Sequence, residues 1–423
     1  MRIIADLHIH SKYARACSKD LDLAHLEQYA RLKGLQVLGT GDFQHPRWMQ
    51  ELQELEQGED GLLRSKTGFP FLLQTEISLM YSQGGKGRRV HLLVLAPHRE
   101  AALQIADVLG KRGRLDYDGR PIFGMPCPEF VELMRGVSPE AEVIPAHAWT
   151  PYFGVFGSKT GFDRLEDCFQ DQARHVHAIE TGLSSDPPMN WRLRQLDKIQ
   201  LLSFSDCHSF WPHRLGREAT VFSLPQLSYQ GILQAIRTGS GLEETIEVNP
   251  AYGKYHWDGH AACGVAQSPA ETKKQGIICP RCRRPLTIGV EYRVEELADR
   301  PAGERPPAGK GYRSLLPLME ILAFARGTAV FAKETVRVYH QLVGQFGTEF
   351  ALLLDAPDQQ LEQLDPAVAQ AILGVRRGEI RVRPGYDGVY GVPEAPGAPR
   401  AAPPAGPQLP RRGQTSLFSF GTA

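Results

Sequence analysis

The segment Asp6-Leu7-His8-Ile9-His10-Ser11 directly follows a mostly apolar run, Met1 to Ala5. The apolar run predicts a β-strand, and residues two apart in a strand project from the same face. His8 and His10 would then project together from the end of the strand, spaced to share one metal ion. Two histidines at this spacing also arise by chance as core or solvated side chains. The pair therefore predicts a metal site only if the rest of the chain supplies further ligands.

Other apolar segments of the chain also meet a histidine or an acidic residue at one end. The residues in these positions are Asp42, Glu76, His91, His147, Glu180, Asp206 and His208. Helical patterns, such as Leu21 to Lys33 and Pro128 to Arg135, lie between these segments. Alternating strands and helices predict a parallel α/β architecture, in which ligands bind at the carboxyl ends of the strands.

Composition limits the classes of partner. The 423 residues suggest two or three domains, and 48 basic against 48 acidic residues leave no global positive field, so any basic surface for nucleic acid must be local. No stretch approaches the ~18 apolar residues of a membrane span, and no signal-peptide pattern is found. We therefore expect a cytoplasmic protein with no membrane partner. Seven cysteines, an odd number, favour reduced thiols and metal ligation over disulfides.

Two short ligand pairs, His260-Ala-Ala-Cys263 and Cys279-Pro-Arg-Cys282, are separated by fifteen residues. Each pair can occupy two corners of a tetrahedron, so the spacing predicts a structural zinc site, a zinc knuckle. His256 competes with His260 for the fourth ligand position. A redox function for the second pair is the alternative, but the thioredoxin-like flanking pattern that it requires is missing from the sequence.

The last third of the chain contains three kinds of sequence in succession. Helical patterns at Leu315 to Ala325, Thr335 to Phe346 and Pro366 to Leu373 predict a small helical module. The stretch Pro393 to Gly413 is mostly Pro, Ala, Gly and Arg, which predicts a disordered tether. The tether ends in the apolar cluster Gln414-Thr-Ser-Leu417-Phe418-Ser-Phe420, and an apolar cluster in such a place is typical of a peptide that docks on a partner.

The ligand motifs, in their order and content, resemble the PHP (polymerase and histidinol phosphatase) superfamily, whose members fold as a distorted (β/α)7 barrel. The resemblance implies phosphoester hydrolysis at a site with two or three metals, in which Glu76, Asp206 and His208 are catalytic. It implies that one metal is held by His8, His10, Glu76 and Asp206, and a second by Glu76, His91 and His147. Glu76 would bridge the two. The third site normally uses a T-D-H motif, which is Gly41-Asp42-Phe43 in this chain, so we assign that site to Asp42, His45 and His208.

Mixed imidazole and carboxylate ligation suits zinc, manganese or iron. The resemblance implies zinc in the barrel as well as in the knuckle, with magnesium or manganese as alternatives for activity. Two cations roughly 3.5 to 4 Å apart stabilise the attacking and leaving oxygens at phosphorus. Asp6 either orients one of the ligand imidazoles or caps a turn.

The barrel motifs, the knuckle and the terminal peptide together resemble the endonuclease Q family over essentially the whole chain. This resemblance implies a DNA repair endonuclease that incises on the 5′ side of uracil, hypoxanthine, xanthine or an abasic site, leaving a 3′-hydroxyl and a 5′-phosphate. Gln414, Leu417 and Phe418 resemble a bacterial sliding-clamp binding peptide, and Gln414, Leu417 and Phe420 a truncated archaeal one. The implied partners are damaged DNA and a sliding clamp, and the implied place is the nucleoid of the cytoplasm.

The segment after His147 is the first candidate for lesion contact. We expect its aromatic residues to stack on an extruded base and its polar residues to contact phosphate: Trp149, Tyr152, Phe153 and Phe156, then Ser158 and Lys159. A hydrophobic lid over the barrel is the alternative. Trp211 and Arg214, just beyond Asp206, form a second candidate wall.

The expected domains are a PHP barrel (1–245), a zinc-knuckle domain (246–300), a helical C-terminal module (301–392), a disordered linker (393–413) and a clamp-binding peptide (414–423). Two other functions stay open. One is a histidinol-phosphatase-like enzyme acting on a small molecule, and the other is a non-catalytic, clamp-bound DNA adaptor.

Overall fold

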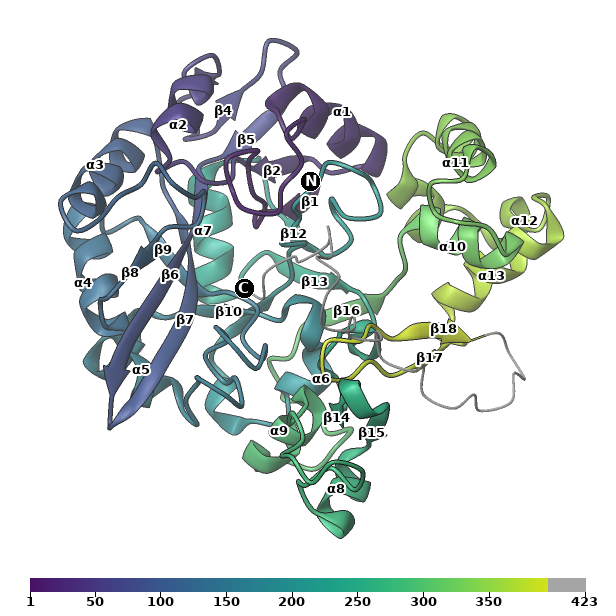
Figure 1. Cartoon of the computed structure of the whole chain (residues 1–423). Helices are drawn as coiled ribbons and strands as arrows, with labels where there is room; N and C mark the ends of the chain where they lie inside the picture. Colours follow the sequence, from purple (N-terminus) through teal and green to yellow (C-terminus); the bar gives the residue numbers. More distant parts are fainter. Residues whose placement is uncertain (395–423) are drawn as a thin grey trace, which may run out of the picture.

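The computed structural model describes residues 1–394 (Figure 1). Its largest sheet has eight strands in the order β16-β13-β12-β1-β2-β5-β4-β3. In that order the strands are Gly311–Ser314, Leu242–Glu247, Ala219–Ser223, Arg2–Asp6, Val37–Gly39, Pro70–Leu72, Leu63–Arg64 and Glu56–Gln57. Strands β1, β2 and β5 pair in parallel, whereas β12 is antiparallel to both β1 and β13.

Two further sheets extend the barrel. One has the order β8-β6-β7-β9, with strands Ile122–Phe123, Gln74–Gln83, Lys86–Leu95 and Glu142–Pro145, and the other pairs β10 (Ala178–Glu180) with β11 (Gln200–Leu202). The predicted mixed α/β class is confirmed. Not all strands are parallel, because β6 and β7 form a ten-residue antiparallel hairpin and β7 is antiparallel to β9. Gly84 and Gly85, both with positive φ, allow the tight reversal between the two long strands.

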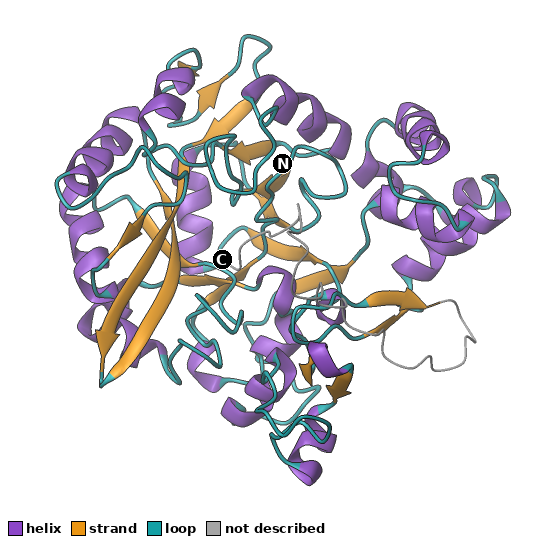
Figure 2. Ribbon diagram, in the orientation of Figure 1, coloured by secondary structure: helices purple, strands orange, loops and turns teal. Residues whose placement is uncertain are grey.

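Helices cover the outside of these strands (Figure 2). They are α1 (Leu23–Lys33), α2 (Pro46–Leu52), α3 (Arg99–Gly110), α4 (Cys127–Val137), α5 (Leu165–Phe169), α6 (Pro187–Asn190) and α7 (Tyr229–Thr238). The two helical patterns in the sequence correspond to α1 and α4. Asp22 caps α1 by accepting a hydrogen bond from the His25 amide, and Gly34, at a φ of 97°, ends it. Leu26 and Ala30 of α1 are fully buried in the core.

The strand connections bring polar side chains to one end of the barrel. His8 and His10 follow β1, His147 follows β9, and Asp206 follows β11. A parallel bridge between Ile9 and Cys207 joins the segments after β1 and β11. The ends of strands far apart in the sequence are therefore adjacent in space.

The knuckle region contains β14 (Asp258–His260), β15 (Val265–Gln267), α8 (Pro269–Gln275) and α9 (Val290–Leu297). The chain then returns to the barrel, where β16 pairs in parallel with β13. Short 3-10 turns connect the other elements, at Gln170–His175, Gly182–Ser184, Arg194–Leu196, Pro250–Tyr252 and Ala261–Cys263.

The three helical patterns expected near the C-terminus correspond to α10 (Leu318–Arg326), α11 (Lys333–Phe346) and α13 (Pro366–Arg376). Two shorter elements, the π-helical turn Ala351–Asp355 and α12 (Asp358–Leu361), lie between α11 and α13. No helix within residues 1–394 combines the length and the apolar character needed to cross a bilayer.

The last described strands, β17 (Arg381–Arg383) and β18 (Val392–Glu394), form an antiparallel pair. Pro393 and Glu394, which we assigned to the linker, therefore lie in a strand. The loop between these strands lies against the segment 251–260, where the amides of Gly385 and Gly391 donate to the carbonyls of Ala251 and Tyr252. The remainder of the expected linker and the clamp-binding peptide 414–423 lie outside the described residues.

Candidate metal centre

The first group of candidate ligands is His8, His10, Glu76 and Asp206, whose ligand atoms all lie within 4.8 Å of one another. His10 Nε2 lies 3.2 Å from Glu76 Oε2 and 3.1 Å from Asp206 Oδ1. His8 Nε2 lies 3.5 and 3.6 Å from the same two oxygens. Two imidazole nitrogens and two carboxylate oxygens thus converge on one point.

The second group is Glu76, His91 and His147. The other oxygen of Glu76, Oε1, lies 2.8 Å from His91 Nδ1 and 3.1 Å from His147 Nε2, and these two nitrogens are 3.1 Å apart. Each Glu76 oxygen therefore faces a different group, which is the geometry of a carboxylate that bridges two metals.

Two carboxylates outside these groups fix the orientation of the imidazoles. Glu180 accepts a hydrogen bond from His8 Nδ1 at 2.9 Å, and Asp42 accepts one from His10 Nδ1 at 3.0 Å. The Nε2 atoms of both rings are thereby left for ligation. Sequence analysis placed Glu180 at a strand end but assigned it no role.

The residues proposed for a third site are not brought together into one group within the described part of the chain. Asp42 already accepts hydrogen bonds through both oxygens, from His10 and from the amide and hydroxyl of Ser11. The His45 ring stacks on Tyr13, with centroids 4.5 Å apart. The contacts show Asp42 orienting His10, and the third site stays a prediction.

His208 lies beside the first group rather than in it. Its ring centroid is 4.5 Å from that of His10, its Nδ1 donates to the Asp206 carbonyl at 3.0 Å, and its side chain is 31% exposed. Burial, together with His10, lowers the pKa of His208. The ring is therefore partly open to solvent beside the first group.

Asp6 anchors a turn and does not orient a ligand imidazole through the hydrogen bonds described. Its two oxygens accept hydrogen bonds from the amides of Ser205, at 3.0 Å, and Gly216, at 2.9 Å. The turn-cap alternative is therefore the one that the contacts support. Burial raises the pKa of Asp6 to about 6.

Arg120 is a functional candidate that sequence analysis missed. Its guanidinium donates to Glu76 Oε2 at 3.1 Å. Burial opposes ionisation of Glu76, but His91 and Arg120 outweigh it and hold its pKa well below the usual range. Arg120 is separated from Glu76 by 44 residues, and neither spacing nor periodicity marks it.

The backbone is strained at three positions around the centre. Asp42, His147 and Asp206 adopt positive φ angles of 38°, 29° and 45°. Residues other than glycine adopt such angles at an energetic cost that is typically accepted at functional sites.

The donor atoms fit divalent metal ions. His8 Nε2 is buried and has no hydrogen-bond partner in the described part of the protein. A buried nitrogen without a partner is costly unless a ligand completes it. Imidazole nitrogens with carboxylate oxygens match zinc, manganese or iron.

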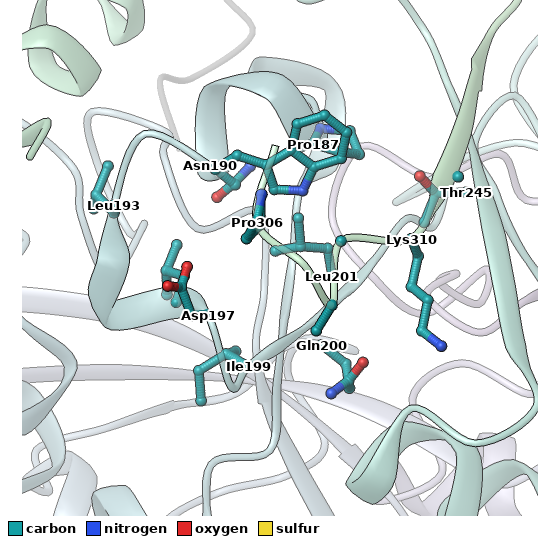
Figure 3. Close-up of a pocket in the computed structure, with 15 residues that line it drawn as sticks. Pro187, Asn190, Leu193, Asp197, Ile199, Gln200, Leu201, Thr245, Pro306 and Lys310 are labelled. Carbon is teal, nitrogen blue, oxygen red and sulfur yellow. The ribbon is translucent and has the colours of Figure 1, made fainter. Parts of the chain in front are cut away.

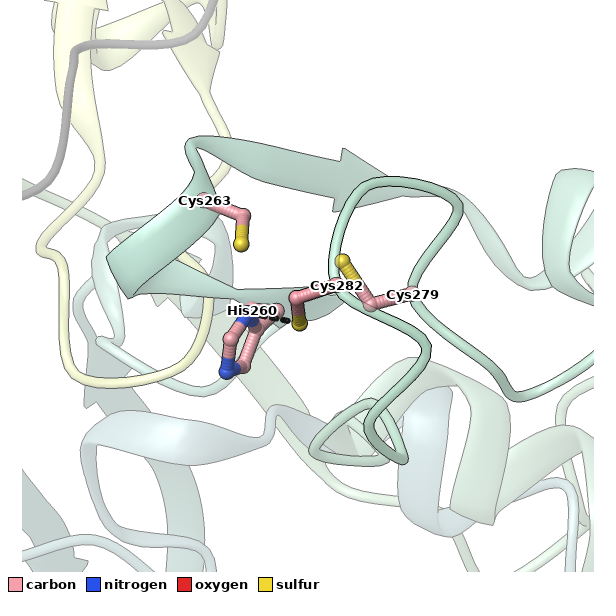
Figure 4. A group of neighbouring side chains, drawn as sticks. All are labelled: His260, Cys263, Cys279 and Cys282. Atoms are coloured by element: carbon pink, nitrogen blue, oxygen red, sulfur yellow. Dashed lines mark hydrogen bonds between the residues drawn. The ribbon is translucent and has the colours of Figure 1, made fainter.

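The knuckle residues His260, Cys263, Cys279 and Cys282 form a third group within 4.8 Å (Figure 4). His260 Nδ1 lies 3.4 Å from Cys282 Sγ. Desolvation opposes ionisation of Cys279, but the amides of Cys282 and Arg281 outweigh it and lower its pKa to about 7. His256 lies instead 3.5 Å from Glu291, so the geometry favours His260 as the fourth ligand. One nitrogen and three sulfurs suit tetrahedral zinc.

The aromatic residues after His147 divide into two sets. Trp149 and Phe156 are fully buried against each other, and the Trp149 indole donates to Asn190 at 2.7 Å. Because both rings belong to the core, the prediction that they stack on a base is wrong. The alternative of a hydrophobic lid fits these two residues. Phe153 is half-buried and stacks 4.3 Å from His91, while Tyr152 is 41% exposed.

The polar residues of the same segment also differ. Ser158 donates its hydroxyl to the Ile288 carbonyl, whereas Lys159 is exposed. Arg89 lies over the Phe153 ring at 5.7 Å and was not identified from the sequence. The cationic part of this wall therefore comes from Lys159 and Arg89.

The second wall contains Trp211 and Arg214. Trp211 is half-buried, with its ring 5.2 Å from that of Phe331 in the helical module, and Arg214 Nη1 lies 3.9 Å from Glu320. Phe331 and Tyr390 are 55% and 63% exposed, and sequence analysis named neither. The Tyr390 ring centroid lies 5.9 Å from the Lys254 ammonium.

A cavity apart from the metal centre lies between α6 and the segment before β16 (Figure 3). It is lined by residues that include Pro187, Asn190, Leu201 and Lys310, and its volume of about 30 Å³ suits a single water molecule. None of the candidate ligands lines it.

Comparisons of the sequence with known proteins give a family model and two relatives. Residues 317–379 match the model of the MJ0043 C-terminal domain. The chain is 31% identical over 250 residues to the uncharacterized protein MJ0043 of Methanocaldococcus jannaschii, a match that covers 58% of this chain and 31% of that relative. It is 28% identical over 415 residues to the uncharacterized protein YqxK of Bacillus subtilis, covering 92% and 98% of the two chains.

Two solved structures resemble nearly the whole molecule. The lesion-specific endonuclease PfuEndoQ from Pyrococcus furiosus has a TM-score of 0.83 and 29% identity, with 93% of this chain and 95% of that one covered. Endonuclease Q in complex with a 27-mer duplex substrate carrying an abasic lesion at the active site has a TM-score of 0.84 and 30% identity, with 94% and 97% covered. Because this likeness extends over both chains almost completely, the chain belongs to the endonuclease Q family.

Proposed function

We propose that this chain is a metal-dependent DNA repair endonuclease that hydrolyses the phosphodiester on the 5′ side of a deaminated base or an abasic site. The observation that carries the proposal is the Glu76 carboxylate, whose two oxygens face two separate groups of ligands. The structural likeness to a lesion-specific endonuclease, and to a relative bound to duplex DNA with an abasic lesion, supports DNA as the substrate.

The proposed ligand sets are His8, His10, Glu76 and Asp206 for one metal, and Glu76, His91 and His147 for the other. The metals would supply an activated water and stabilise the charge that develops on the phosphate oxygens. Glu180 and Asp42 hold the imidazoles of His8 and His10 in the tautomer that ligation needs.

Arg120 and His208 have roles of their own. Arg120 offers its remaining N–H groups to a phosphate oxygen next to Glu76. His208, which lies partly exposed beside the first group, would take a proton from the attacking water and return it to the departing 3′ oxygen.

For the lesion, the proposed contacts are the accessible residues at the barrel mouth. Phe153 and Tyr152 provide ring faces for an extruded base, while Arg89 and Lys159 provide charge for the backbone phosphates. Trp211 and Arg214 form the second wall, with Phe331 beside Trp211.

We further propose zinc in the knuckle and zinc in the barrel, with magnesium or manganese as alternatives in the barrel. A sliding clamp is the proposed protein partner, through Gln414, Leu417, Phe418 and Phe420, and the support for this is the sequence pattern.

The experiment uses an end-labelled duplex with one uracil, hypoxanthine or abasic site, and histidinol phosphate in parallel, each with and without chelator. We expect incision on the 5′ side of the lesion, and we expect chelator to abolish it. A folded Asp206→Asn variant should fail to incise. Release of phosphate from histidinol phosphate without DNA incision would instead favour a small-molecule phosphatase. Binding of lesion DNA without any hydrolysis would favour an adaptor.

A further inference from the structure

The loop 205–216 carries both Asp206 and His208, and we call it the ligand loop. Asp6 holds its two ends through the amides of Ser205 and Gly216. Between these ends the loop runs for ten residues without regular secondary structure. Backbone contacts hold the first part of the loop, since the amides of His10 and Ser18 donate to the carbonyls of Cys207 and His208. The position of Asp206 and His208 then depends also on what holds the middle of the loop.

Lys33 holds the middle. It is the last residue of α1, only 1% exposed, and its ammonium donates to the Pro212 carbonyl at 2.8 Å. Its aliphatic chain lies against Gly216, where an added Cβ would come within 2.9 Å of Lys33 Cγ. Lys33 thus contacts both the middle and the end of the ligand loop.

The charge of Lys33 is balanced from the helical module. Glu349, which is fully buried between α11 and the π-helical turn, accepts from the Lys33 ammonium at 2.7 Å. The same oxygen accepts from the Leu318 amide at 2.9 Å, at the start of α10. A buried ammonium left without its carboxylate would be strongly unfavourable, so the place of Lys33 depends on Glu349.

Other contacts between the ligand loop and the module agree with this arrangement. The Phe331 ring packs edge-on against Trp211 and His213, with centroids 5.2 and 4.9 Å away. Arg214 lies 3.9 Å from Glu320 of α10. The module therefore contacts the loop that carries two residues of the metal centre, although it contributes no candidate ligand itself.

We propose that Lys33 and Glu349 are positioning residues, through which the helical module sets the place of Asp206 and His208 and hence the metal affinity of the first site. The readout of turnover rests on the proposed function, whereas the readout of metal affinity does not. A shift of about 1 Å at a reacting centre is enough to cost ~10²-fold in rate.

The test compares Glu349→Gln and Lys33→Met with Arg300→Gln. Arg300 is a matched control because it is also buried and ion-paired, with Asp197, but it does not contact the ligand loop. Thermal unfolding, manganese affinity of the barrel, and kcat and KM on an abasic duplex are measured for each variant. At comparable loss of Tm, we expect the two positioning variants to bind manganese ~10-fold or more weakly, with lower kcat and unchanged KM, and Lys33→Arg to recover part of the loss.

A double variant, Lys33→Met with Glu349→Leu, keeps the proposal testable if single variants unfold, because an apolar pair often replaces a buried ion pair without loss of stability. It should fold yet still bind manganese weakly, since Pro212 lacks its donor. Wild-type manganese affinity in the folded double variant, or equal losses in Arg300→Gln, would overturn the proposal. If the wild-type protein incises no lesion, the proposed function fails, and the manganese measurement still decides this inference.

Discussion

Glu180 accepts the Nδ1–H of His8 with both carboxylate oxygens, at 2.9 and 3.0 Å, and one of these oxygens also accepts the amide of His147 at 2.6 Å. A single buried carboxylate thus sets the tautomer of a residue in the first ligand group and the backbone of a residue in the second. Glu180 thus connects the two groups through hydrogen bonds outside the ligand atoms, whereas Glu76 connects them through its own ligand oxygens.

Glu180→Gln should therefore weaken metal binding without unfolding the protein. An amide cannot accept from His8 and His147 with both terminal atoms, and loss of such an outer contact typically lowers metal affinity ~10- to 100-fold. A calorimetric titration with metal measures the affinity of each variant. Glu142→Gln is the matched control, since Glu142 is also buried and accepts from a histidine, His177, away from the centre. Equal affinity in the two variants would contradict the role of Glu180.

Phe153→Ala should impair incision at uracil more than incision at an abasic site. An abasic site has no base to stack, while loss of one stacking contact costs about 1–3 kcal/mol. Initial rates on the two duplexes give the ratio of incision at uracil to incision at an abasic site. In contrast, Phe156→Ala should lower the free energy of unfolding by ~3–5 kcal/mol because it removes a buried ring, and it should leave that ratio unchanged. An unchanged ratio in Phe153→Ala would argue for a lid.

Stability should fall with rising pH because of Glu247. Burial raises the pKa of this carboxyl to about 8, and burial also raises the pKa of its neighbour Glu218 well above the usual range. The folded state then holds a proton that the unfolded state has lost above about pH 4.3, so the stabilisation is complete below that pH and is lost as the pH rises toward 8.

Glu247→Gln cannot ionise but keeps an oxygen for Thr181 and Ser203. Its free energy of unfolding should exceed that of the wild type by on the order of 5 kcal/mol at pH 8.5 and match it near pH 4. Urea unfolding across this range gives the comparison. Glu166→Gln, at an exposed position, should follow the wild-type pH dependence. If Glu247→Gln also follows it, the carboxyl is not protonated in the folded protein.

Cys279→Ser combined with Cys282→Ser should remove about one zinc per chain and weaken DNA binding, because structural zinc supplies much of the folding free energy of a small module. Elemental analysis and a DNA-binding titration measure both effects. Cys17→Ser is the control, because Cys17 lies outside the knuckle group. Unchanged zinc in the double variant would show that these thiols are not ligands.

Deleting residues 414–423 should abolish binding to the sliding clamp and leave incision of a short free oligonucleotide unchanged, since a terminal docking peptide acts by raising local concentration. Calorimetry with a bacterial and an archaeal clamp tests binding and distinguishes the two types. Retained clamp binding, or lost activity on the free oligonucleotide, would rule out the docking role.

The types and order of the residues were enough to predict the chemistry of the metal centre. The H-x-H pair and the strand-end carboxylates were found because each is marked locally by an apolar run. A local signal does not distinguish a ligand from the residue that orients it, so the sequence could not predict that Asp42 bonds to His10.

Other features depend on contacts between distant residues. Lys33 and Glu349 are 316 residues apart, and the sequence around neither residue predicts that they pair. Aromatic content alone also failed to separate Phe153 from Phe156. The backbone at Phe153 has a φ of 67°, a local reversal that the residue types do not predict.

The route of the chain has a consequence for biosynthesis. Strand β16 joins the edge of the barrel only after the knuckle has been made, and the knuckle segment 251–260 acquires its last neighbours from residues 385–391. While the ribosome is still making the middle of the protein, the edge of β13 is bare, and bare strand edges invite aggregation. The edge of β13 is therefore covered only by sequence that is translated late, which makes the nascent chain a candidate client for chaperones.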